Sequence, residues 1–108
     1  MNIIVTGANR GIGKAIAEAF VRNGDNVWAC CRHANEEMMA WANANTTDKK
    51  WVKIVEFDLT KEDEIAGGFK TILKEKEPID VLVNVAGIGH MGLFVVAGLS
   101  CREIDGLR

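Results

Sequence analysis

Three glycines near the start of the chain have the spacing of a phosphate-binding turn. Gly7, Gly11 and Gly13 follow the apolar run Ile3–Thr6 and open a stretch with helical periodicity. A strand that ends in glycines and leads into a helix places backbone N–H groups, and the positive end of the helix dipole, around an anion. The pattern therefore predicts a nucleotide phosphate site, whose expected residues are Gly7, Asn9, Arg10, Gly11, Ile12 and Gly13.

Each glycine has its own expected role in this turn. We expect Gly7 to leave the strand in a conformation that a side chain would forbid, and Gly13 to allow close packing of helix on strand. Gly11 is expected to let the backbone approach a pyrophosphate. The alternative is a glycine-rich turn in some other kind of α/β protein.

The stretch from Thr6 to Gly13 resembles the cofactor turn of the short-chain dehydrogenase/reductase family, which has the pattern Thr-Gly-x-x-x-Gly-Ile-Gly. The resemblance implies a Rossmann-like, doubly wound parallel sheet that binds NAD(P). It also implies hydride transfer between that cofactor and a carbonyl or secondary alcohol, with a 3-oxoacyl reductase-like role as the expected subclass. It covers essentially the whole chain, but only the first half of the family's fold.

The residues after the second predicted strand bear on the choice between NAD and NADP. An acidic residue there would bind the ribose 2′-hydroxyl of NAD, whereas a basic one accommodates the 2′-phosphate of NADP. The chain has Cys31 and Arg32 at this place, with no carboxylate until Glu36. Because Arg32 and Arg10 could both bind a phosphate, NADP is predicted over NAD. The alternative is that both arginines are solvated surface charges.

Two residues after the third predicted strand resemble the family's acidic–apolar pair beside the adenine. By that resemblance Asp58 would hydrogen-bond the base and Leu59 would pack on it. The alternative is simply a helix start, and Thr60 is expected to cap the next helix in either case.

A similar resemblance appears at the end of the fourth predicted strand. The family has Asn-Asn-Ala-Gly where this chain has Asn84, Val85, Ala86 and Gly87. The resemblance implies that Asn84 ties strands together and that Ala86 and Gly87 leave room for ribose and nicotinamide. Val85 supplies no amide, so any polar contact made by the second Asn is lost. A tight loop without a ligand role is the alternative.

No catalytic residue is predicted in this chain. The family transfers protons with a Ser and a Tyr-x-x-x-Lys pair, but the sequence contains no tyrosine, and Ser100, its only serine, does not match the motif. The chain is therefore expected to be inactive alone. A fragment of a longer reductase, a small dinucleotide-binding or redox-sensing module and a decayed remnant all remain open, with the fragment favoured.

The elements that must position these residues alternate along one domain, 1–108. Strands are expected at 3–6, 27–31, 51–57 and 79–84, and helices at 11–22, from 36 to about 45, and from Thr60 through Leu73. Strands that alternate with helices predict a parallel sheet in the order 3-2-1-4. Residues 85–94 are expected as a loop and 101–108 as a last helix capped by Ser100. The far edge of the fourth strand would then be unpaired, which predicts self-association.

Composition excludes several other functions. The formal net charge of −2 is spread along the chain and gives no case for nucleic acid or an anionic membrane as partner. No apolar run is long enough to span a membrane. Cys30 and Cys31 are neighbours that point to opposite faces of a strand, so they fit a reducing, cytoplasmic compartment. Cys31 and His33 are only part of a metal site, and no metal is predicted.

Overall fold

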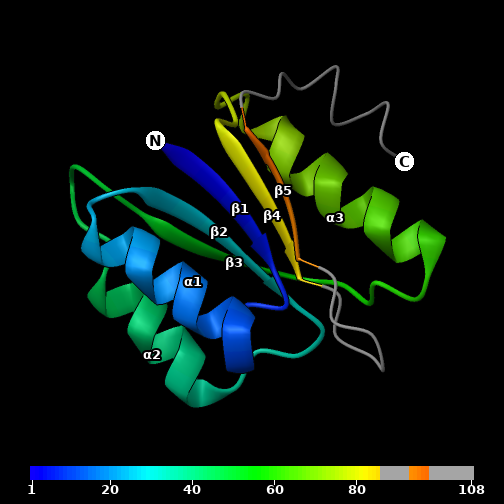
Figure 1. The fold of residues 1–108 in the computed structure, drawn as a ribbon, viewed down its shortest axis with the longest axis horizontal. Coiled ribbons are helices and arrows are strands. Elements are labelled where there is room, and N and C mark those ends of the chain that lie inside the picture. The colour runs from blue at the N-terminus through cyan, green and yellow to red at the C-terminus, as the bar shows by residue number, and fades with distance from the viewer. Residues whose placement is uncertain (86–92, 98–108) are drawn as a thin grey trace.

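The computed structural model describes residues 1–85 and the backbone strand at 93–97, which together form a sheet with helices on both faces (Figure 1). Its strand order is β3-β2-β1-β4-β5. The elements in chain order are β1 (Asn2–Thr6), α1 (Gly11–Arg22), β2 (Asn26–Cys31), α2 (Glu36–Ala44), β3 (Val52–Glu56), α3 (Glu62–Lys74), β4 (Val81–Val85) and β5 (Leu93–Ala97).

The first four strands are parallel and confirm the predicted order 3-2-1-4. Val5 pairs with Ala29 of β2 on one side and with Val83 of β4 on the other. Every residue of β1 is buried, as expected for a parallel strand covered on both faces. β3 lies at one edge of the sheet and β5 at the other. The carboxyl ends of β1, β2, β3 and β4 therefore meet at one edge of the sheet.

The fifth strand corrects the prediction for residues 85–94 and for the sheet edge. Leu93–Ala97 pairs antiparallel with β4, and Val83 lies opposite Val95. The apolar run of β5 satisfies the backbone groups of β4 that were expected to be unpaired. Self-association through the β4 edge therefore loses its premise. The predicted helix at 101–108 lies outside the described residues.

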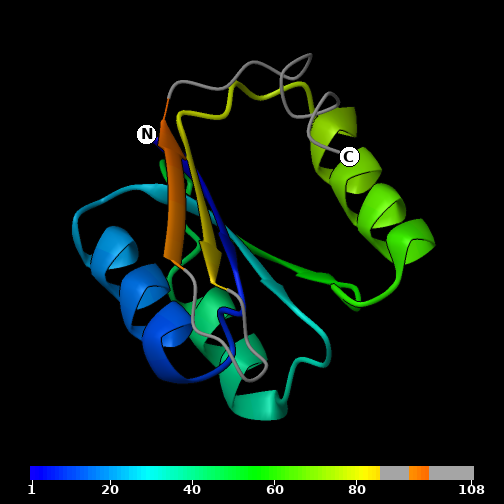
Figure 2. The ribbon, with the colours of Figure 1, turned by 45° about the vertical axis from the view of Figure 1, so that its right-hand side comes forward.

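Two apolar clusters lie on opposite faces of the sheet. Alternate side chains of β1 separate, because Ile3 and Val5 join the cluster that also contains α1 and α2 residues, whereas Ile4 joins the cluster that contains Ile72 of α3. Figure 2 shows α1 and α2 on one face and α3 on the other. Within residues 1–85, the three helices are all too short and too polar to traverse a bilayer.

Two helix ends have typical capping features, and a third differs from its prediction. Gly24 has φ of +90° directly after α1, and the Asn35 side chain accepts a hydrogen bond from the Met38 N–H at the start of α2. The predicted Thr60 cap of α3 is wrong. The N-cap residue is Lys61, without a side-chain capping bond, because the Thr60 hydroxyl donates to Asp58 instead.

Candidate functional site

The glycine turn between β1 and α1 has the conformation that the sequence predicts. Gly7 and Gly11 have φ of +64° and +59°, a region that side chains rarely adopt. A Cβ on Gly13 would collide with the carbonyl group of Gly7, so the helix can pack this closely on the strand end only without a side chain. A Cβ on Gly11 would meet nothing within 4 Å, so this glycine faces open space.

The helix α1 begins without a capping side chain. Arg10 is the N-cap residue in an extended conformation, with no side-chain capping bond, and no acidic residue lies in the first turn. Ile12 is 45% exposed although it is a large apolar residue. An uncapped helix start beside open glycine backbone is suited to bind an anion.

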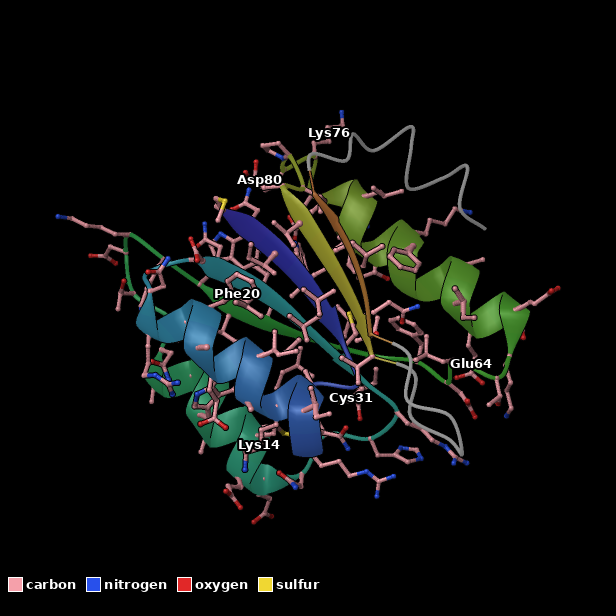
Figure 3. The ribbon with its side chains drawn as sticks, in the orientation of Figure 1. Lys14, Phe20, Cys31, Glu64, Lys76 and Asp80 are labelled. Carbon is pink, nitrogen blue, oxygen red and sulfur yellow. The ribbon has the colours of Figure 1, made fainter. Side chains whose placement is uncertain are left out.

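A cleft of about 530 Å³ joins this turn to the ends of β2 and β3. Its volume lies in the usual range for a small-molecule site. Figure 3 shows Cys31, which lines the cleft, at the carboxyl ends of the strands, with Lys76 and Asp80 at the opposite end. The predicted residues that line it are Gly7, Asn9, Arg10, Gly11, Ile12, Arg32, Asp58 and Leu59.

The remaining predicted residues are placed differently. Gly13 lies behind the cleft wall, where it allows the contact of α1 with β1. Asn84 lies near the end of β4, next to Val85, which lines the cleft. Ala86 and Gly87 lie outside the described residues.

Asn84 ties β4 to β1 through a threonine hydroxyl. The Thr6 Oγ1 donates to the Asn84 Oδ1 over 2.7 Å and accepts from the Val85 N–H over 2.9 Å. Thr6 is buried, and its bond from the Val85 N–H is buried as well. The hydroxyl therefore holds the ends of β1 and β4 together immediately before the glycine turn. Val85 itself lines the cleft, and at this position it offers an apolar surface in place of an amide.

Asp58 is held by its own turn. Its Oδ1 accepts hydrogen bonds from the Thr60 N–H at 2.9 Å and the Thr60 hydroxyl at 2.7 Å, while its backbone N–H donates to Glu64 Oε1. The hydrogen bonds from Thr60 are the main reason that the pKa of Asp58 lies below its ordinary value. The Arg32 Nε lies 3.5 Å from the other carboxylate oxygen. The ends of β2 and β3 are thus linked by opposite charges at the cleft.

Cys31 and His33 are among the cleft-lining residues that were not predicted as binding residues. Burial, and then the Glu56 carboxylate, raise the pKa of Cys31 to about 11, so its thiol stays protonated at neutral pH. Exposed His33 follows Arg32 at the mouth of the cleft. Their place at the carboxyl end of β2 is the signal that could have identified them.

A family model for short chain dehydrogenases matches residues 1–104. The chain belongs to the short-chain dehydrogenase family. Human retinol dehydrogenase 11 is 34% identical over 87 residues, which are 80% of this chain and 27% of that protein. The 3-oxoacyl-[acyl-carrier-protein] reductase FabG of Chlamydia muridarum is 39% identical over 96 residues, 85% of this chain and 37% of the reductase.

Solved structures of the family have the same fold. A 4-hydroxyisoleucine dehydrogenase complexed with NADH superposes with a TM-score of 0.68 at 32% identity, over 81% of this chain and 34% of that one. A 3-oxoacyl-[acyl-carrier protein] reductase from Brucella melitensis, in complex with NAD, gives a TM-score of 0.69 at 28% identity, over 82% and 34% of the two chains. The present chain thus spans about a third of the length of these relatives.

Proposed function

We propose that this chain is the cofactor-binding portion of an NADP(H)-dependent short-chain oxidoreductase that acts on a carbonyl or secondary alcohol. The observation that carries the proposal is a single cleft in which an uncapped helix start, open glycine backbone and two arginines come together. These are the groups that a dinucleotide with an extra phosphate requires.

The proposed roles follow from the position of each residue around the cleft. The backbone of Gly11 and Ile12 would hold the pyrophosphate at the start of α1, and Arg32, with Arg10, would hold the 2′-phosphate. Asp58 and Leu59 would contact the adenine. Asn84 would tie β4 to β1 beside the cleft, and Ala86 and Gly87 would leave room for ribose and nicotinamide. When bound, the nicotinamide supplies the hydride.

A 3-oxoacyl reductase-like substrate is part of the same proposal. It is supported by two relatives whose names state that activity, one found by sequence and one by structure. The substrate site and the proton-transfer residues would come from a portion of the enzyme outside this chain. We also propose a cytoplasmic location, because Cys30 and Cys31 are free, buried thiols on opposite faces of β2.

A second candidate is a dinucleotide-binding module without catalysis. It is supported by the same cleft, and it needs no proton-transfer residue from outside this chain. The two candidates differ in a simple assay. A module would bind NADPH without reducing any ketone. For the enzyme, we expect the gene to continue into a segment with a Tyr-x-x-x-Lys motif.

The first prediction tests the cofactor choice. Arg32→Asp should weaken NADPH binding at least about tenfold more than NADH binding, because only NADPH carries the 2′-phosphate and charge-assisted bonds to it are strong. Titration calorimetry with each cofactor measures the two dissociation constants.

Arg22→Asp is the matched control for this test. It makes the same charge change in the last turn of α1, at the end of the helix away from the cleft. We expect it to leave the ratio of the two dissociation constants unchanged. Equal losses of NADPH and NADH binding in the Arg32 variant would show that Arg32 does not meet the 2′-phosphate.

A further inference from the structure

The cation expected to hold the 2′-phosphate has a carboxylate beside it. Arg32 follows β2 and Asp58 follows β3, and their side chains approach to 3.5 Å between Nε and Oδ2. Arg32 is 70% exposed at its side chain, whereas the Asp58 side chain is only 12% exposed. The arginine can therefore turn toward a ligand, but the carboxylate stays in the cleft wall.

The carboxylate of Asp58 is held by two hydrogen bonds, and its main chain is held by a third. Two from Thr60 hold its Oδ1, and one from its own backbone N–H to Glu64 Oε1 holds the main chain. The positive groups that act on it are Arg32 and, more weakly, Lys61. A cofactor phosphate that binds Arg32 must therefore share the guanidinium with a carboxylate that does not move away.

The fold places the Asp58 carboxylate at the end of β2, where the sequence itself has no acidic residue. Along the chain, no acidic residue follows β2 until Glu36, and that absence predicts NADP. Because β3 pairs with β2, Asp58 after β3 nevertheless lies next to Arg32 after β2. A carboxylate at this place can accept a hydrogen bond from a 2′-hydroxyl and repels a 2′-phosphate.

We infer that Asp58 is a specificity-determining residue that limits the preference for NADP(H) over NAD(H). This inference rests on the proposed function. The distance from a phosphate bound to Arg32 to the Asp58 carboxylate would be comparable to the Debye length. That length is about 10 Å at 0.1 M salt. The repulsion acts on the charged phosphate of NADPH and spares the neutral hydroxyl of NADH.

Asp58→Asn tests this inference. The amide oxygen keeps the acceptor for the Thr60 bonds and removes the charge. We expect the ratio of the NADH to the NADPH dissociation constant to rise about threefold to tenfold at low salt. A change of this size corresponds to the Coulomb repulsion between the Asp58 carboxylate and the 2′-phosphate in a highly polar medium. Loss of an adenine contact would weaken both cofactors equally, so the ratio separates the two roles of Asp58.

Two further variants make the test decisive. Asp63→Asn changes the net charge equally in the exposed first turn of α3 and should leave the ratio unchanged. Asp58→Ser removes the same charge and should raise the ratio as Asn does, which covers the case in which the Asn variant does not fold. A ratio in the Asp58 variants that equals the wild-type ratio, or falls below it, overturns the inference. Wild-type protein that binds neither cofactor overturns the proposed function itself.

Discussion

Gly13 is the residue at which the glycine turn between β1 and α1 tolerates least change. The atoms that a Cβ would meet are the backbone of Gly7 and Thr6, which cannot rotate away as a side chain can. Gly13→Ala should therefore destabilise the fold by about 1–3 kcal/mol, the usual cost of overpacking, and should weaken cofactor binding as α1 moves off β1. Urea unfolding and NADPH titration measure the two effects.

Gly67→Ala is the matched control for that substitution. Gly67 lies in α3, where a Cβ would meet nothing within 4 Å, so alanine should stabilise the helix by roughly 0.5–1 kcal/mol. A Gly13 variant as stable as wild type would contradict the close contact of α1 with β1.

For a single residue, the sequence predicts a role that depends on backbone conformation better than a role that depends on pairing with another charge. Gly7 and Gly13 adopt their expected roles because conformation and lack of a side chain are local properties. The Arg32–Asp58 pair is not predicted, because the two residues are 26 positions apart and meet only when β2 pairs with β3. Side-chain pairing across strands depends on register, which single-residue patterns do not specify.

In the connection between β3 and α3, the Thr60 hydroxyl affects both the start of α3 and the position of Asp58 in the candidate site. Thr60→Val removes one of the two Thr60 bonds to Asp58, so the pKa of Asp58 should move back toward its ordinary value of about 3.9. NMR titration of the carboxyl group measures this shift.

The sign of the pH effect follows from linkage. Because the folded-state pKa of Asp58 is lowered, its contribution to stability is present above the unfolded-state pKa and is lost as the pH falls through the folded value. Thr60→Val should reduce this acid-dependent loss of stability. Thr71→Val is the control, since its hydroxyl bonds a helix carbonyl, that of Gly67, and not a carboxylate. Identical titration of Asp58 in wild type and the Thr60 variant would contradict the assigned turn.

Among the helices and strands, periodicity identifies α1, α2, α3 and the four parallel strands, but not β5. The run Leu93–Ala97 is apolar, yet it is short and lies between Gly92 and Gly98, so the glycines favour a loop. Its pairing with β4 is a long-range preference for covering an exposed sheet edge, which the local sequence does not reveal. Thr60 shows the same limit, because its hydroxyl could cap either a helix or an aspartate turn.

For the whole molecule, the alternation of strands and helices is sufficient to predict the sheet order 3-2-1-4 and the edge at which the site forms. A network of amides holds the opposite edge. Asn2 donates to the Pro78 carbonyl and accepts from Asn26, and Asn26 in turn accepts from the Trp51 N–H. This network aligns the amino ends of four strands, so that their carboxyl ends meet at one cleft. The substrate site is not predictable at this scale, because the chain spans about a third of its relatives.

We propose that the backbone amides of the glycine turn hold a dinucleotide. Amide NMR spectra of the isotope-labelled chain, recorded during titration with NADPH, test it most directly. We predict that the largest shift changes occur at Gly11, Ile12 and Gly13, with smaller changes at Arg32 and Asp58. Saturable NADPH binding that leaves the amides of residues 7–13 unshifted would contradict the claim.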